Sequence, residues 1–160
     1  SYVRGIIDVL TAHLEPDVSV SGIDTTGAAA SWISHSTTFH VDCAASSSSY
    51  GVVVGTSTQA VAITDYKLIA QIVHGTGAGQ LSHGAVSVGA PYTDGTSRKV
   101  TIARTFTNNS GASITINEVG LYCEAYTTTI KYCCLDRTLY TVVVGNGTSV
   151  TFTYTIKVTV

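Results

Sequence analysis

The last eleven residues of the chain, residues 150–160, alternate almost perfectly between apolar and polar side chains. One face carries Phe152, Tyr154, Ile156, Val158 and Val160, and the other carries Thr151, Thr153, Thr155, Lys157 and Thr159. Because side chains repeat every second residue in a strand, this segment predicts a β-strand. A strand of this length extends about 36 Å, which is longer than the usual strand of a globular domain. We therefore expect it to complete a sandwich or to reach a neighbouring subunit.

A second alternating pattern spans residues 100–122 and is interrupted by residues 108–111, with the sequence Asn-Asn-Ser-Gly. That sequence is typical of a tight turn between antiparallel strands. A three-residue loop with Gly111 in the left-handed conformation brings the apolar faces of the two strands together. We therefore predict a bulged β-hairpin in which Phe106 faces Ile114.

Two charged residues interrupt the apolar rows of this predicted hairpin. In the register given above, Arg104 faces Ile116, and Arg104 and Glu118 are diagonal neighbours on one face. Because buried charges normally occur in pairs, we interpret Arg104 and Glu118 as a structural ion pair that fixes the register. The alternative interpretation is a catalytic or ligand-binding carboxylate with its arginine.

The remaining segments also favour short strands separated by turns. Strand patterns occur within residues 17–54 and in residues 80–88, 119–126, 130–135 and 139–144, and Gly145-Asn146-Gly147 marks a second hairpin turn. Residues 63–70 predict a short helix capped by Thr64 or Asp65. The fold class that follows is all-β: a jelly-roll-like β-sandwich with one short internal helix and a short N-terminal helix or arm.

The N-terminal segment has the best helical periodicity in the chain, and Glu15-Pro16 ends it. Its apolar stripe includes Ile6, Ile7, Leu10 and Leu14. A short amphipathic segment of this kind packs on its own domain or docks on a neighbouring subunit. We therefore divide the chain into residues 1–16, an N-terminal helix or assembly arm, and residues 17–160, a single sandwich domain.

The composition restricts the partners that the chain can bind. Only 11% of the residues are charged and the net charge is -2, so nothing attracts nucleic acid or an acidic membrane surface. No apolar run reaches the roughly 20 residues that span a bilayer. Ser and Thr make up roughly a quarter of the chain, far above ordinary usage. A surface of hydroxyls instead of charges suits an extracellular or assembled protein, covered by neighbouring subunits or glycans.

The four cysteines are Cys43, Cys123, Cys133 and Cys134. Their spacing matches neither a CxxC redox motif nor a zinc site. An even number of cysteines in a chain of this composition favours disulfides. We expect Cys123 to pair with Cys133 or Cys134 across a hairpin, and Cys43 to take the other; four reduced, buried thiols are the alternative.

Two sequons place asparagines at predicted hairpin tips. Asn108-Asn109-Ser110 and Asn146-Gly147-Thr148 both match the N-glycosylation pattern, so Asn108 and Asn146 are glycosylation candidates. Such sequons also arise by chance in a chain this rich in threonine.

No catalytic constellation is apparent in the sequence. The five histidines have no HExxH or HxH pairing, no GxSxG elbow accompanies the serines, and the acidic residues lack a calcium-loop spacing. The Gly-rich residues 75–79 lack the Gly-Lys-Ser/Thr of a phosphate loop. We therefore expect a protein that is not an enzyme and has no cofactor and no metal.

Part of the chain resembles a known group of proteins. Residues 104–122, RTFTNNSGASITINEVGLY, are similar to a pattern in phage and prophage virion structural proteins of β-sandwich type. The segment VGTST at residues 54–58, the segment DYKL at 65–68, and Leu135-Asp136-Arg137 with the closing TYTIKVTV resemble their flanking regions. This resemblance implies a structural role without catalytic residues; the four cysteines and the high Ser and Thr content depart from the pattern.

These observations favour a structural subunit that self-assembles head-to-tail into an extracellular filament or a virion fibre or tube. The expected mechanism is exchange of a terminal arm or strand, with side chains such as Ile6, Tyr154 and Ile156 filling pockets of the next copy. The alternative is an adhesin or carbohydrate-binding module at a fibre or tail tip, which would use the nine tyrosines and Trp32.

Overall fold

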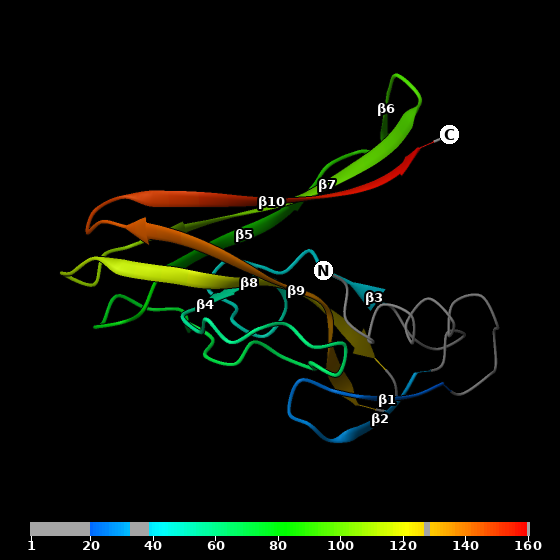
Figure 1. Ribbon diagram of the computed structural model, residues 1–160, viewed down its shortest axis with the longest axis horizontal. Helices are drawn as coiled ribbons and strands as arrows, with labels where there is room; N and C mark the ends of the chain where they lie inside the picture. The colour runs from blue at the N-terminus through cyan, green and yellow to red at the C-terminus, as the bar shows by residue number, and fades with distance from the viewer. Residues whose placement is uncertain (1–19, 33–38, 127–128, 160) are drawn as a thin grey trace.

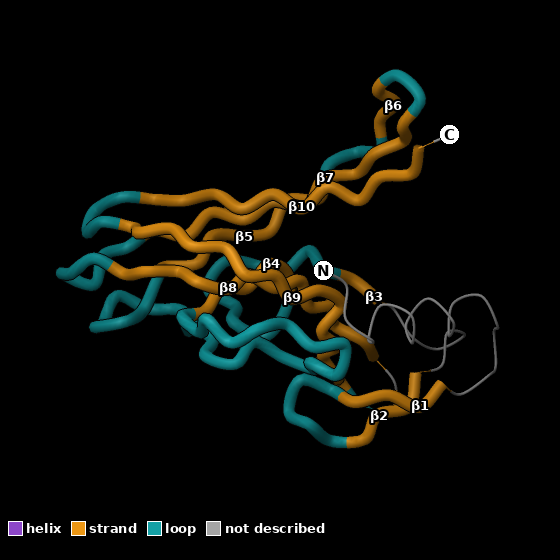
Figure 2. The backbone as a smooth tube through the Cα atoms, viewed as in Figure 1, coloured by secondary structure: helices purple, strands orange, loops and turns teal. Residues whose placement is uncertain are grey.

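The computed structural model describes residues 20–32, 39–126 and 129–159. Within these ranges the chain consists of strands, turns and loops, without a helix (Figures 1 and 2). The strands are β1 (Val20–Ile23), β2 (Ala29–Trp32), β3 (Phe39–His40), β4 (Gly51–Gly55), β5 (Ser82–Val88), β6 (Tyr92–Asp94), β7 (Ser97–Thr107), β8 (Ile114–Tyr126), β9 (Ile130–Val144) and β10 (Ser149–Thr159). The predicted all-β class is confirmed for the described residues.

The strands form two four-stranded antiparallel sheets and a small β1–β2 hairpin. In sheet I, β7 lies in the middle, with β10 on one side and β5 and β6 on the other. In sheet II, β8 lies in the middle, with β9 on one side and β4 and β3 on the other. The two sheets enclose a shared apolar core, an arrangement consistent with a β-sandwich.

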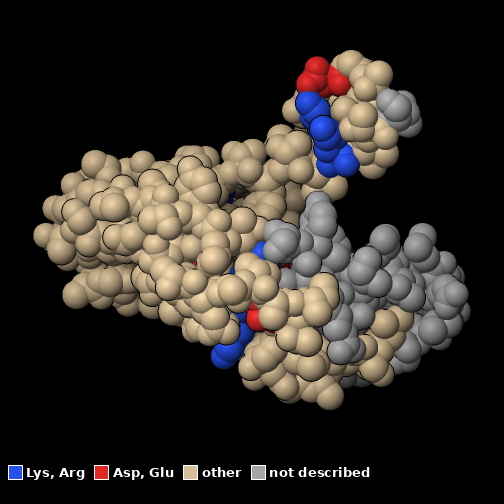
Figure 3. Space-filling model, viewed as in Figure 1, with Lys and Arg blue, Asp and Glu red and all other residues tan. Residues whose placement is uncertain are grey.

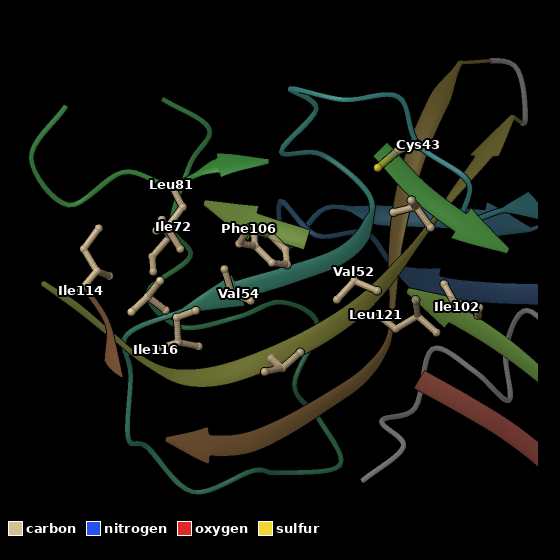
Figure 4. Close-up of a cluster of buried hydrophobic side chains, with 13 residues drawn as sticks. Cys43, Val52, Val54, Ile72, Leu81, Ile102, Phe106, Ile114, Ile116 and Leu121 are labelled. Carbon is tan, nitrogen blue, oxygen red and sulfur yellow. The ribbon is translucent and has the colours of Figure 1, made fainter. Parts of the chain in front are cut away.

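The core between the sheets draws on both of them (Figure 4). Sheet I contributes Phe106 and Ile102, and sheet II contributes Ile116, Val54 and Leu121. All five side chains are buried, because alternate residues of a strand point to the same face. Burial of an aliphatic or aromatic side chain of this size contributes about 1.5–3 kcal/mol.

The predicted hairpin of residues 100–122 is wrong. Strand β7 pairs with β10 and β5, whereas β8 pairs with β9 and β4, so the connection of residues 108–113 crosses from one sheet to the other. Phe106 and Ile114 both enter the core, but from different sheets. The apolar alternation fits either arrangement, because it records which side of a strand is buried and not which strand lies beside it.

Hydrogen bonds join the turn of residues 108–111 to the turn of residues 145–147. The buried side chain of Asn108 donates from Nδ2 to the carbonyl oxygens of Ala112 (2.8 Å) and Val144 (2.7 Å). The backbone N–H of Gly111 donates to Oδ1 of Asn146 at 2.9 Å. Gly111 and Gly147 have φ angles of 88° and 76°, which favour glycine. The prediction of turns at both places is confirmed, although the Gly145–Gly147 turn also joins different sheets and is no hairpin.

The predicted helix at residues 63–70 is also wrong, because these residues form turns and bends. The side chain of Asp65 accepts a hydrogen bond from the N–H of Ala62, three residues earlier in the chain, and does not cap a helix. The backbone N–H groups of Ile69 and Ala70 donate to the carboxylate of Glu118, and sheet II thereby takes donors that a helix would have used internally.

Strand β9 is continuous, where the sequence predicts two strands separated by Asp136 and Arg137. Both residues are buried, and polar partners in the folded chain compensate for their charges. The pairing of β9 with β8 shifts between Ile116 and Glu118 and again between Leu121 and Tyr122. The first shift places Tyr140 and Thr141 of β9 opposite a single residue of β8, as in a β-bulge.

Buried His83 makes the stability of this fold dependent on pH. Burial lowers the pKa of His83 to about 4, and nearby Arg104 acts in the same direction. The unfolded chain, with an ordinary pKa near 6.5, therefore binds more protons between these two values. Stability is fully present above pH 6.5 and is lost as the pH falls towards 4, by at most about 3 kcal/mol.

Urea unfolding followed between pH 7.5 and 4 measures this dependence. We expect the His83→Asn variant, which has no titrating ring, to lose less stability than the natural chain over this range. Parallel pH profiles for the two proteins would contradict the assignment to His83.

Candidate functional site

Strands β9 and β10 lie beside each other (Figure 1), with the rings of Tyr140 and Phe152 in contact. Residues of both strands line a groove. Its volume is about 350 Å³. Strand β9 contributes Thr138 and Tyr140, strand β8 contributes Val119, and strand β10 contributes Thr151, Phe152, Thr153 and Tyr154. The groove therefore has one wall from each sheet, and its lining is aromatic and hydroxylic without a charged side chain.

The aromatic side chains of the groove are held in defined positions. The rings of Tyr140 and Phe152 meet edge to face, with centroids 5.7 Å apart and an interplanar angle of 89°. Phe152 also packs on buried Phe106, at 6.1 Å. Tyr140 remains 56% exposed, so the ring rests on the core without being covered. The bulge in β9 lies at this residue, a position where bulges commonly redirect a side chain.

A buried carboxylate orients two hydroxyl groups of the same region. Asp136 is 3% exposed, and its Oδ2 accepts hydrogen bonds from the hydroxyl groups of Tyr154 (2.9 Å) and Thr138 (3.1 Å). Burial and the neighbouring Asp136 raise the pKa of Tyr154, so its hydroxyl remains protonated. Both hydroxyl groups donate their hydrogens to Asp136, and this shared acceptor fixes the orientation of Thr138 and Tyr154.

The strands that border the groove are the outer strands of their sheets. Within residues 20–32, 39–126 and 129–159, β10 pairs with β7 alone and β9 pairs with β8 alone. Each strand therefore has a second edge that no described strand covers. Such an edge presents backbone N–H and C=O groups that can pair with another chain.

The far ends of β7 and β10 project from the body of the molecule, together with β6 (Figure 1). Ile156 and Val158 belong to this projecting ribbon and are 39% and 66% exposed. Lysine, arginine and aspartate side chains gather on the same ribbon, including the ion pair of Lys99 with Asp94 (Figure 3). The prediction that β10 extends over the whole C-terminal segment is confirmed for Ser149–Thr159.

The outer face of β10 and β7 is a ladder of hydroxyl groups. Thr151 faces Thr105, and their Oγ1 atoms lie 2.7 Å apart; Ser149 faces Thr107, with hydroxyl oxygens 2.8 Å apart. Thr153 continues the row on β10. This face is exposed, and cross-strand hydrogen bonds stabilise its geometry.

The predicted ion pair of Arg104 with Glu118 is wrong. Arg104 is buried in sheet I, where its guanidinium donates to the carbonyl oxygens of Gly84 (2.8 Å), Val52 (3.0 Å), Tyr50 (3.4 Å) and Ser47 (2.6 Å). Because Val52 belongs to β4, Arg104 links sheet I to sheet II. The partners of Arg104 are backbone carbonyl groups instead of the expected carboxylate.

Glu118 instead pairs with Arg137 across sheet II. Oε2 of Glu118 lies 2.8 Å from Nε of Arg137, and both side chains are fully buried. Arg137 also donates to Oδ2 of Asp65 at 2.8 Å and to the carbonyl oxygen of Gln59 at 2.7 Å. The pair therefore attaches the loop of residues 56–81 to the outer face of sheet II. A Cβ on Gly55 would lie 2.5 Å from Oε1 of Glu118, so this site requires glycine there.

The two sequons differ in their environments. Because Nδ2 of Asn108 is buried and donates to two carbonyl groups, the folded chain cannot carry a glycan there, and this prediction is corrected. Asn146 is exposed on the turn between β9 and β10, where its Oδ1 accepts from Gly111. Asn146 stays a predicted glycosylation site.

The structure contains four free, buried cysteines, so the predicted disulfides are not present in it. Cys43 lies in the core between the sheets, whereas Cys134 packs with Val53 and Tyr122 on the opposite face of sheet II. A bond between Cys43 and Cys134 would have to pass through the sheet, so that pairing is wrong.

Cys123 and Cys133 are register partners on β8 and β9 and share one apolar cluster. Directly opposite residues of antiparallel strands have Cα atoms about 4.5–5.5 Å apart, within the range of disulfides. The structure nevertheless leaves both thiols free, so we expect alkylation of the unfolded, unreduced chain to modify four thiols. Modification of only two would show that a disulfide forms in the natural protein.

The other assembly candidates lie partly beyond the described residues. Ile6, Ile7, Leu10 and Leu14 belong to residues 1–19, which are outside the described ranges, and so does the predicted N-terminal helix. Tyr154 lies in the groove, and Ile156 lies on the projecting ribbon.

Comparison with known proteins gives no relative for this chain: no protein-family model, curated protein or solved structure matches it. In the part of the chain that the structure describes, no group of three or more His, Cys, Asp or Glu residues is placed to hold a metal ion. A search of the same residues finds no helix with the length and apolar character needed to cross a membrane.

The groove was missed at the level of sequence. Tyr140 and Asp136 belong to segments that were interpreted as a strand and a turn, and neither alone indicates a site. The sequence feature that pointed to this region was the polar pair Asp136-Arg137 within a run of β-rich sequence. Such a pair is compatible with a turn and equally with two buried charges in a continuous strand.

Proposed function

We propose that this protein is a non-enzymatic structural subunit that self-assembles head-to-tail into an extracellular filament or a virion fibre. The observation that carries the proposal is the outer edge of β10, an eleven-residue strand with a single partner among the described residues. Natural proteins usually protect an edge of this length with charges, bulges or proline. The only charged residue of β10 is Lys157, and β10 pairs with β7 in an unbroken register.

The side chains along this edge also favour a protein partner. Ile156 and Val158 are exposed on the projecting ribbon, beyond the core that buries Phe106 and Ile116. A strand of the next copy that paired with β10 would cover them, as in other cases of β-strand addition. The hydroxyl ladder lies at the other end of the same strands, whereas the ribbon that carries Ile156 and Val158 also carries Lys157 and the ion pair of Lys99 with Asp94.

The direction of growth follows from the asymmetry of this contact. The edge of β10 on one copy would contact a different surface of the next, whether a strand or the N-terminal arm. A contact between unlike surfaces need not close into a dimer, so it can propagate into a fibre. The resemblance of residues 104–122 to virion structural proteins supports the same proposal. We also propose a jelly-roll-like connectivity for the sandwich.

Sedimentation velocity of the purified chain over a hundredfold range of concentration tests this function. We expect the average size to rise continuously with concentration, without a plateau at a dimer or another closed oligomer. A chain that sediments as a monomer throughout the range would overturn the proposal.

A further inference from the structure

The inner face of the projecting ribbon is an apolar surface that continues the core. Val88 of β5 is the register partner of Ile102 of β7, whose side chain is buried between the sheets. Ile156 of β10 pairs with Val100, which alternates with Ile102 along β7. Ile156 and Val158 therefore share this face with Val88. We call Val88, Val100, Ile156 and Val158 the overhang face.

The overhang face is open to solvent in the single chain. Val88 is 47% exposed, Ile156 39% and Val158 66%. The ribbon that carries them extends away from sheet II (Figure 1), whereas Phe106, nearer the other end of β7, is fully buried between the sheets. Because an apolar sheet face is stable when a second layer covers it, a neighbouring molecule is the natural source of that layer.

The sequence of the N-terminal arm, residues 1–16, supplies side chains that fit such a face. The arm carries an apolar stripe that consists of Ile6, Ile7, Leu10 and Leu14. The internal segments outside the described ranges are short and mostly polar, with the sequences ISHSTT at residues 33–38 and TT at 127–128. Of the chain beyond the described strands, the arm is therefore the part with enough apolar side chains to cover the overhang face.

The charge beside the overhang face fits the same segment. Arg98 lies on the inner face of β7 and is exposed. Its guanidinium donates to the hydroxyl group of Thr93 at 3.0 Å, and no carboxylate of the described residues pairs with it. The arm carries two carboxylates, Asp8 and Glu15, and one arginine, Arg4. Complementary charges of this kind fix the register of a contact more than they raise its affinity.

We infer that the overhang face binds the N-terminal arm of the next copy in the fibre. This inference rests on the proposed function and identifies the second surface of its head-to-tail contact. The apolar stripe of the arm provides the second layer over the overhang face, and Asp8 or Glu15 pairs with Arg98. Since the arm and the overhang face are unlike surfaces, the contact repeats from copy to copy.

Substitution of Val88 separates this contact from strand pairing along the edge of β10. Val88 lies on β5, with β7 between it and β10, so Val88→Lys leaves the free edge of β10 unchanged. We expect Val88→Lys to remain a monomer in sedimentation velocity, because docking would bury its ammonium group. Ser87→Lys is the matched control, since Ser87 is exposed on the opposite face of the same strand. The control should assemble normally, and the urea midpoint of each variant checks its fold.

A labelled peptide tests the identity of the occupant. Fluorescence anisotropy follows a fluorescein-labelled peptide of residues 1–16 as the full chain is added at concentrations below those of assembly. We expect saturable binding that Val88→Lys weakens at least about tenfold and Ser87→Lys leaves unchanged. The peptide Ile7→Ser/Leu10→Ser, which lacks half of the stripe, should bind more weakly than the natural peptide. An excess of the natural peptide should also reduce the average size of the assembled chain.

The outcomes distinguish this inference from the proposed function. Absence of peptide binding, or equal binding by Val88→Lys and Ser87→Lys, would overturn the inference. Assembly of Val88→Lys as far as the natural chain would overturn it too, while pairing along the edge of β10 would stand. A natural chain that stays monomeric but binds the peptide through Val88 would support the contact between arm and overhang face and overturn the fibre.

Discussion

Replacement of Arg137 by methionine lowers the free energy of unfolding by about 3–5 kcal/mol, the usual cost of removing one partner of a buried ion pair. The reason is the carboxylate left behind. Glu118 is fully buried, and in Arg137→Met it keeps the N–H donors of Ile69 and Ala70 but loses its cation. The loop of residues 56–81 also loses hydrogen bonds from Arg137 to Gln59 and Asp65.

Urea denaturation at pH 7 measures this loss, and Arg98→Met is its control. Arg98 is exposed on β7, where it donates to Thr93, so its replacement should change stability by less than about 1 kcal/mol. The double variant Arg137→Met/Glu118→Gln should be more stable than Arg137→Met, because the fully buried charge of Glu118 is removed and only Asp65 is left without its cation. Equal stability of Arg137→Met and Arg98→Met would show that the pair does not hold the loop on sheet II.

We expect lysine at Ile156 and Val158 to abolish the proposed assembly while the fold is retained. Both side chains are exposed on the projecting ribbon, so their replacement removes no core contact of comparable size. A strand that paired with β10 would have to desolvate two new ammonium groups beside Lys157. Lysine on edge strands is the means by which many natural sheets avoid pairing with one another.

Sedimentation velocity with the concentration series described above distinguishes the variant from the natural chain. We expect Ile156→Lys/Val158→Lys to remain a monomer, with an unchanged urea midpoint. Ile63→Lys is the matched control, because Ile63 is 68% exposed on the loop of residues 56–81 and lies away from β10. If the double variant assembles as well as Ile63→Lys does, the edge of β10 is not the contact.

Most of the strands could be predicted from the sequence, because burial of one face leaves a two-residue period. The two-residue period of residues 150–160 predicted β10, which the structure describes as Ser149–Thr159. The Gly-containing sequences at residues 108–111 and 145–147 predicted turns for another local reason. Each turn needs a left-handed backbone conformation at one residue, and Gly111 and Gly147 adopt it readily.

Pairing of the strands could not be predicted from that pattern. A hairpin and a crossing between sheets both place Phe106 and Ile114 in a core. In the structure, Asn108 lies at the start of the crossing. Its side chain bonds Val144, which is distant in sequence, and this contact ties the crossing to the end of β9. A local reading of Asn-Asn-Ser-Gly contains no information about Val144.

The partners of the buried charges were unpredictable for a similar reason. Arg104 binds carbonyl oxygens, which every residue possesses, so no sequence pattern marks them. Arg137 was assigned to a turn because Asp136-Arg137 is polar, although both residues are buried within β9. In the same way, the groove depends on the approach of β9 to β10, which follows from tertiary structure and not from either strand alone.

Electron microscopy of the purified, unmodified chain tests the proposed function most directly. Assembly through the edge of β10 predicts unbranched fibres of uniform width with a regular axial repeat, and averaged images in which β10 of each subunit lies at the contact with the next. Fields of separate, compact particles at concentrations well above those of sedimentation would contradict the proposal that this protein is a fibre subunit.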